Sequence, residues 1–204
     1  VLLSGVLLWD ALFRGQLGVA ISFFEEIWAR NLGHLFVSPL RPYEMILSLG
    51  AMSLIRTVIG VVPAAVMAVI FFGFNLASLG ISLAGFLFLL LIMGWALGLL
   101  ICGIVMRYGQ GAETLAWAAI FAVAPVSGVY YPIAVLPAWL QWVAHGLPSA
   151  YVFEGMRGIL VHHEIRLELM LIAAGLDVVY LLVGSAAFVA YLRMSRRRGL
   201  LLQQ

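Results

Sequence analysis

The sequence contains no lysine and little charge of either sign. All 11 basic residues are arginines, there are 9 acidic residues, and charged residues make up 10% of the 204-residue chain against 65% hydrophobic residues. Average globular chains carry about 25% charged residues, so this composition excludes a soluble domain and indicates an integral, multi-pass membrane protein. The net charge of +2 gives no basic excess of the kind that binds nucleic acid.

The missing lysine, the single cysteine and the spacing of the histidines limit the chemistry that this chain can carry. A Walker A motif, G-x-x-x-x-G-K-[ST], requires a lysine, so we expect no ATP or other cofactor bound by such a motif here. Cys102 is the only cysteine, which excludes an internal disulfide and a cysteine-based metal site. His162, His163 and Glu164 are adjacent and no third ligand follows at a suitable spacing, so we predict an exposed loop there and no metal site.

Apolar stretches account for most of the chain. About 20 helical residues cross a hydrocarbon core of about 30 Å, and the sequence has five stretches close to that length. We predict transmembrane helices at residues 1–24, 51–73, 81–106, 114–131 and 169–192. The fold class is therefore an all-α polytopic membrane protein with one transmembrane domain over residues 1–204.

Two of these predicted spans contain charged residues. Asp10 and Arg14 lie in the first span at a spacing of four residues, which places them on one helix face where they can form an ion pair. Even so, two charges make insertion marginal, so we expect neighbouring helices or a polar cavity beside this span. Asp177 lies in the last span, where an acid is either a functional group or paired with a polar group on a neighbouring helix.

The arginines predict the orientation. With residues 22–44 in the cytoplasm, eight arginines lie inside and two outside, as the positive-inside rule requires. The inside set is Arg30, Arg41, Arg56, Arg107, Arg193, Arg196, Arg197 and Arg198, and the outside set is Arg157 and Arg166. Residue 1 then lies outside, and because the chain starts with valine we expect a further span upstream, giving six in all.

The polar passage after the first span predicts a separate cytoplasmic helix at about residues 23–37. Its apolar residues recur on one face, and Ser22 with Glu25 has the spacing of a capping box at a helix start. Glu26 and Arg30 have the favourable order for an ion pair. Proline at position 39 ends the helix, and Pro42 suits the first turn of the next one. A simple interfacial anchor is an equally good interpretation of the pattern alone.

A second unusual segment, about residues 132–158, is rich in proline and aromatic residues. Prolines at 132, 137 and 148 break it into short pieces, and tyrosine and tryptophan favour the membrane interface. We predict a pair of short helices that enter the outer leaflet and return. A purely structural cap is the alternative.

Both segments resemble one family. "LFVSPLRPYEMIL" is similar to the coupling-helix region of permease subunits of type-2 ATP-binding-cassette (ABC) exporters, and "PVSGVYYPIAVLPAWLQWVAHGLPSAYVFEGMRGIL" is similar to the segment before their last span. The matches occur in the right order. The resemblance covers the chain from the family's second span onward, so we expect the family's first span to lie upstream of residue 1. "EEIWARN" replaces the "ERE.GT" form of many drug exporters, which leaves the substrate class open.

The resemblance implies a transport component that is not itself an enzyme and that sits in the bacterial cytoplasmic membrane. It implies a second permease copy as homodimer or heterodimer, and an ATPase subunit that binds ATP and Mg. The substrate is an amphiphile, either drug-like or a lipid-linked glycan. The residues implied to contact the ATPase are Glu25, Glu26, Arg30, Ser38, Pro39, Leu40 and Arg41. Those implied at the exit side of the path are Tyr130, Tyr131, Pro132, Pro137, Trp139, Glu154 and Arg157.

Two other functions stay open from the residues alone. A proton-coupled secondary transporter could use Asp10 and Asp177, although no internal repeat of the kind found in many such transporters is evident. A membrane enzyme could use His145, His162 or His163, but no set of nucleophile, base and orienting residue is present. Gly94 and Gly98 form a small-xxx-small pattern, for which we predict packing within the subunit.

Overall fold

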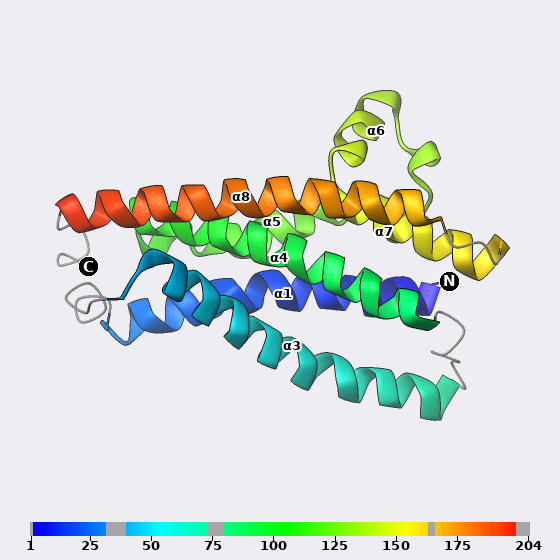
Figure 1. The fold of residues 1–204 in the computed structure, drawn as a ribbon, viewed down its shortest axis with the longest axis horizontal. Helices are drawn as coiled ribbons and strands as arrows, with labels where there is room; N and C mark the ends of the chain where they lie inside the picture. The colour runs from blue at the N-terminus through cyan, green and yellow to red at the C-terminus, as the bar shows by residue number, and fades with distance from the viewer. Residues whose placement is uncertain (1, 32–39, 73–79, 163–165, 199–204) are drawn as a thin grey trace.

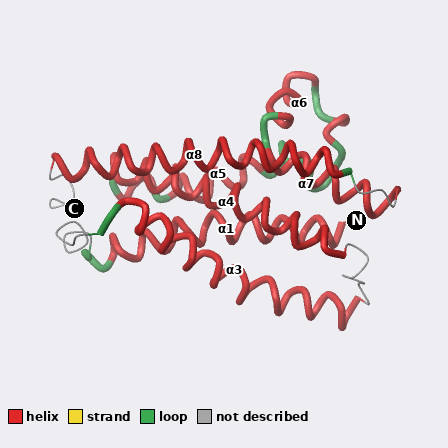
Figure 2. The backbone as a smooth tube through the Cα atoms, in the orientation of Figure 1, coloured by secondary structure: helices red, strands yellow, loops and turns green. Residues whose placement is uncertain are grey.

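The computed structural model describes residues 2–31, 40–72, 80–162 and 166–198. Every regular element in these ranges is helical and none is a strand (Figure 2), which confirms the predicted all-α class. Four long helices dominate: α1 (Leu2–Trp28), α3 (Pro42–Phe72), α4 (Gly80–Tyr108) and α8 (Leu167–Arg198). Each contains a stretch long and apolar enough to cross a membrane.

α4 is the central helix of the bundle and packs between α1 and α8 (Figure 1). α1, α4 and α8 run in the same direction. On α4, Gly94 and Gly98 approach Leu12 to Val19 of α1, while Gly103 approaches Tyr191 of α8. α3 runs the opposite way along α1 and splays outward toward its end (Figure 1). Most of α3 is accordingly exposed, with only 22% of its candidate span buried.

Close contact between α1 and α4 depends on glycine. A side-chain carbon on Gly94 would lie 2.8 Å from the Leu12 carbonyl oxygen, and one on Gly98 would lie 2.9 Å from the Gln16 carbonyl oxygen. Distances this short are not tolerated, so only glycine lets the two backbones approach so closely. The prediction that Gly94 and Gly98 pack within the subunit is confirmed.

The short helices follow α4 in sequence. They are η2 (Gln110–Ala112), α5 (Thr114–Val123), η3 (Ile133–Val135), α6 (Ala138–His145), α7 (Pro148–Arg157) and a π-helical turn η4 (Gly158–His162). The span predicted at 114–131 is wrong in its second half, because α5 ends at Val123. Turns follow, with Pro125 exposed and Gly128 at φ +70°, a conformation that a helix cannot contain.

The helix start predicted at Ser22 is also wrong. α1 continues through Ser22 to Trp28, because Phe23 and Phe24, directly after Ser22, are buried in the core. The Ser22 hydroxyl is buried without a hydrogen-bond partner among the described residues, so no capping box forms.

α1 ends instead in a Schellman motif, several residues before the predicted end of the helix at 37. The Arg30 N–H donates to the Ile27 carbonyl at 2.9 Å and the Asn31 N–H donates to the Glu26 carbonyl at 3.0 Å. Arg30 has φ 53°, the left-handed conformation that closes such a helix end. Residues 32–39 lie outside the described ranges, so only the first part of the predicted 23–37 helix can be placed.

α3 begins at Pro42, as the first-turn proline predicts, rather than at residue 51 where we placed the start of the span. The N–H of Arg41, directly before the helix, donates to the Glu44 carboxylate at 2.7 Å, which satisfies one donor at this helix start. The earlier start moves Arg56 from the expected cytoplasmic edge to the middle of the helix, inside the candidate span Pro42–Met67.

Candidate functional site: the arginine-rich end, the charged helix faces and an apolar groove

The arginine-rich end of the bundle is where α1 ends, α3 begins, and α4 and α8 end. Arg30, Arg41, Arg107 and Arg193 are exposed there, and α8 closes with Arg196 to Arg198. Arg157 and Arg166 lie at the opposite end, beside the end of α7 and the start of α8. The charge asymmetry that predicts the orientation therefore persists although Arg56 lies mid-helix.

An ion pair joins α1 to α3 close to this end. The Arg56 Nη2 donates to the Glu25 carboxylate at 2.6 Å, with side-chain exposures of 34% for Arg56 and 49% for Glu25. Sequence reasoning missed this contact, because it joins residues 31 positions apart on different helices. It ties the last turns of α1 to the middle of α3.

The neighbouring acid also has a different partner from the one predicted. Glu26 accepts a hydrogen bond from Asn31 Nδ2 at 2.7 Å. The predicted pair with Arg30 is not formed. Arg30 itself has the left-handed conformation that ends the helix, so its side chain no longer lies on the same helix face as Glu26. Of the other predicted contact residues, Arg41 is exposed and Leu40 is half-buried, while Ser38 and Pro39 lie outside the described residues.

The acids inside the spans differ from each other. Asp10 pairs with Arg14 as predicted, with the Arg14 Nε 2.6 Å from the carboxylate. Asp177, by contrast, is 1% exposed in α8, and neither of its oxygens has a hydrogen-bond partner among the described residues. An unpaired buried carboxylate is costly, so Asp177 is the least satisfied group in the described bundle.

The segment from residue 132 to 158 forms two short helices, α6 and α7, as predicted. α7 is buried against α8 and α4, whereas α6 stands away from the bundle (Figure 1). On α6, Trp139 is 69% exposed and Trp142 is 82% exposed. Tryptophan favours a membrane interface, which agrees with the expected entry of this segment into the outer leaflet. That entry stays a prediction.

Hydrogen bonds from side chains to backbone carbonyls hold residues 125–157 together. The Arg157 Nη1 at the end of α7 donates to the Gly128 carbonyl at 2.7 Å, and the Tyr131 hydroxyl donates to the Pro125 carbonyl at 2.6 Å. Burial lowers the pKa of Arg157, while the negative charge of Glu154 raises it. Glu154 itself is exposed, as are Tyr130 and Pro132, and Pro137 precedes α6. Arg157 thus serves as a structural clamp on this segment.

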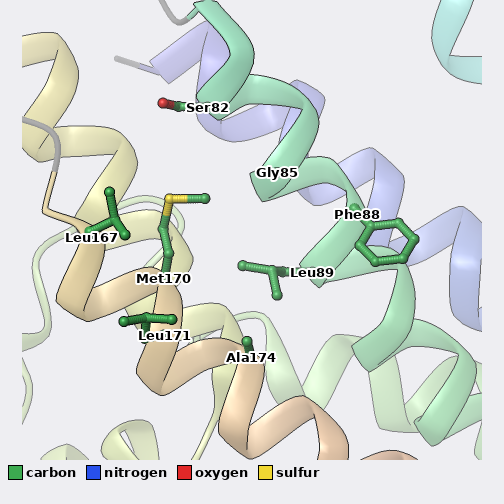
Figure 3. Close-up of a pocket in the computed structure, with 8 residues that line it drawn as sticks. All are labelled: Ser82, Gly85, Phe88, Leu89, Leu167, Met170, Leu171 and Ala174. Carbon is green, nitrogen blue, oxygen red and sulfur yellow. The ribbon is translucent and has the colours of Figure 1, made fainter.

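An apolar groove lies between α4 and α8, toward the end opposite the arginines. Its volume is about 480 Å³. Figure 3 shows residues from both helices facing one another across it, with Met170 extending toward Gly85. The lining residues are Ser82, Gly85, Phe88, Leu89, Leu167, Met170, Leu171 and Ala174. Such a groove suits an alkyl chain and offers almost no hydrogen-bonding groups.

No three His, Cys, Asp or Glu side chains in the described ranges lie close enough to hold a metal ion. Of the predicted loop at His162, His163 and Glu164, His162 instead ends the π-helical turn η4, and the other two residues lie outside those ranges. His145 is exposed at the end of α6, where its carbonyl accepts a hydrogen bond from the Tyr151 hydroxyl at 3.0 Å.

Comparison with protein families decides the class. The family of ABC-2 type transporters matches residues 5–161 of the chain, which spans α1, α3, α4 and both segments that carry the resemblance. The chain belongs to this family. It is therefore a permease component of an ABC transporter, and its long apolar helices make it an integral multi-pass membrane protein. Comparison with the sequences of curated proteins gives no match.

Proposed function

We propose that the permease is the membrane subunit of an ATP-driven exporter in a bacterial cytoplasmic membrane, with ATP and Mg bound by a separate ATPase. The absence of lysine supports this division, because the chain cannot supply a Walker A motif. Membership of the ABC-2 family supports both an ATPase partner and a second permease copy. The arginine-rich end faces the cytoplasm and receives the ATPase.

The observation that carries this proposal is the link between α1 and α3 at that end. The chain between them, residues 29–41, contains the second part of the coupling helix predicted at about 23–37 and the turn after it, and we call it the coupling segment. Its first flank carries Glu25, which holds Arg56 in the middle of α3 at 2.6 Å. A displacement of the coupling segment by the ATPase therefore moves the end of α1 and the middle of α3 together.

The substrate is an amphiphile. The α4–α8 groove accepts an alkyl chain, and the predicted outer-leaflet segment lies at the same end of the bundle (Figure 1). Drug-like amphiphiles and lipid-linked glycans both fit this description. Transport from the arginine-rich end toward the end that carries α6 and α7 is export.

Reversing the Glu25–Arg56 pair tests this coupling. Glu25→Arg and Arg56→Glu each place like charges opposite one another, and we expect each to lower substrate-stimulated ATP hydrolysis by the purified permease–ATPase complex several-fold. The double variant restores an attractive pair and regains most of the stimulation. Glu168→Arg is the matched control, because it reverses an exposed acid at the opposite end of the bundle, away from the ATPase.

The same preparation separates the proposal from its alternatives. Failure of any ATPase to co-purify with the full-length permease contradicts ATP-driven transport. Loss of transport on collapse of the proton gradient, with ATP still present, favours the proton-coupled alternative. Of the two acids that this alternative needs, Asp10 is already held by Arg14, which leaves only Asp177 without a partner among the described residues.

A further inference from the structure

Two arginines inside the candidate spans face the same cavity. Arg14 lies near the middle of α1 and Arg56 near the middle of α3, within the spans Ser4–Trp28 and Pro42–Met67. The cavity between them has a volume of about 220 Å³. The residues that line it are Phe13, Arg14, Leu17, Gly18, Ile21 and Arg56. Both charged groups in this lining are cations.

The carboxylates that hold the two arginines do not line the cavity. Asp10 binds the Nε of Arg14, and Glu25 binds one terminal nitrogen of Arg56, each at 2.6 Å. A guanidinium carries five N–H groups, and these contacts use one on each arginine. The remaining N–H groups of both side chains have no partner among the described residues, so they can bind a ligand.

Two glycines shape the place where Arg14 lies. A side-chain carbon on Gly60 of α3 would collide with the Arg14 guanidinium, so the bare backbone there is what makes room for it. Gly18 of α1 contacts Ser53 of α3, and a side-chain carbon at Gly18 would lie 2.6 Å from the Ser53 hydroxyl. Close contact at Gly18 and the missing side chain at Gly60 let the Arg14 guanidinium lie at this interface.

The chemistry of the lining identifies the ligand. The side chains of Arg14 and Arg56 are 41% and 34% exposed, and a charge exposed to hydrocarbon is strongly unfavourable. Each arginine already has one acidic partner, but hydrocarbon cannot satisfy the N–H groups left over, and an anion between the arginines can accept them. Guanidinium groups match phosphate oxygens with paired hydrogen bonds. Phe13, Leu17 and Ile21 supply an apolar surface beside the charges. The volume equals that of about seven waters in the liquid, enough for a phosphate group.

We propose that this cavity, the α1–α3 phosphate site, binds the phosphate group of an amphiphile between Arg14 and Arg56. The amphiphile's alkyl chain lies over the apolar lining. Membrane phospholipids and a phosphate-bearing transport substrate share this chemistry. The site does not depend on the proposed exporter function, because binding requires neither ATP nor the ATPase.

Binding is measured by fluorescence anisotropy on the full-length permease in a neutral detergent, without ATPase. The probes are an alkyl phosphate with a fluorophore on its alkyl chain, and the alcohol and trimethylammonium compounds with the same labelled chain. We expect only the phosphate to bind tightly. The variant Asp10→Asn/Arg14→Gln removes the guanidinium and leaves no unpaired acid, and it should weaken phosphate binding at least tenfold. Asp10→Asn alone keeps Arg14 and should not weaken binding.

Two further variants separate charge from position. Gly60→Val keeps every charge but displaces the Arg14 guanidinium, and it should also weaken phosphate binding, while Arg193→Gln should not. Mass spectrometry of the wild-type protein then distinguishes the source. A phospholipid that co-purifies with wild type and is lost from Asp10→Asn/Arg14→Gln identifies a membrane lipid, whereas binding of added alkyl phosphate to a lipid-free cavity identifies a substrate site.

Equal binding of the phosphate and alcohol probes overturns the proposal, as does a folded Asp10→Asn/Arg14→Gln variant that binds like wild type. Circular dichroism and size-exclusion profiles establish that each variant is folded. If wild type binds no phosphate probe and two copies of a Phe13→Cys variant form a disulfide with each other, a second permease subunit covers the cavity, and the proposal is wrong.

Discussion

Replacing Gly94 by valine is expected to prevent α1 and α4 from packing, so that little folded permease accumulates in the membrane. The nearest atoms to a side chain at this position are the Gln16 nitrogen and the Leu12 carbonyl oxygen, both at 2.8 Å. They belong to the backbone and cannot rotate away. Overpacking typically costs about 1–3 kcal/mol, and the rigid surroundings place this substitution at or above the upper end, a large part of a total stability of about 5–15 kcal/mol.

The measurement is the yield and thermal midpoint of detergent-solubilised permease by fluorescence-detected size exclusion. Gly175→Ala in α8 is the matched control, because a side-chain carbon at Gly175 meets no atom within 4 Å, and its midpoint should stay near that of wild type. Gly98→Val should behave like Gly94→Val, since Val19 and the Gln16 carbonyl lie within 3 Å of the added carbon. Wild-type yield and midpoint for both valine variants would show that α1 and α4 do not pack this closely in the membrane.

Features that depend on length, composition and local spacing could be predicted from the sequence. Four of the five predicted spans correspond to the four long helices among the described residues, because a helix satisfies its own backbone in lipid. The Asp10–Arg14 pair follows from a four-residue spacing within one helix. The start of α3 at Pro42 follows from the fixed φ of proline.

Features that depend on contacts between distant residues could not. Glu25 looks like part of a capping box when only its neighbours are considered, yet it pairs with Arg56 on another helix. Arg30 fits a helical ion pair by spacing but takes a left-handed conformation that sequence rarely signals outside glycine. Arg157 has its partner at Gly128, 29 residues earlier. Glu25 and Arg157 therefore depend on tertiary contacts, whereas Arg30 depends on the local hydrogen bonds that close the end of α1.

Replacing Asp177 by valine is expected to stabilise the permease while reducing transport. Asp177 is 1% exposed and neither oxygen finds a partner among the described residues, whereas apolar side chains surround this part of α8 on the bundle side. A buried polar group left without a hydrogen bond costs about 1–3 kcal/mol, and valine removes that cost. A group kept at such a cost in a membrane span indicates a role in function, so transport should fall while the thermal midpoint rises.

Asp10→Val provides the opposite case in the same protein. Asp10 is paired, so its removal leaves Arg14 without its acid inside a candidate span, and breaking one side of a charge pair is destabilising. We therefore expect the midpoint to rise for Asp177→Val and to fall for Asp10→Val, although both substitutions exchange an acid for the same apolar residue. A lower midpoint for Asp177→Val would show that Asp177 is paired in the membrane, through a group of the second permease copy or outside the described residues. A higher midpoint with unchanged transport would show that Asp177 lowers the stability of the permease and has no role in transport.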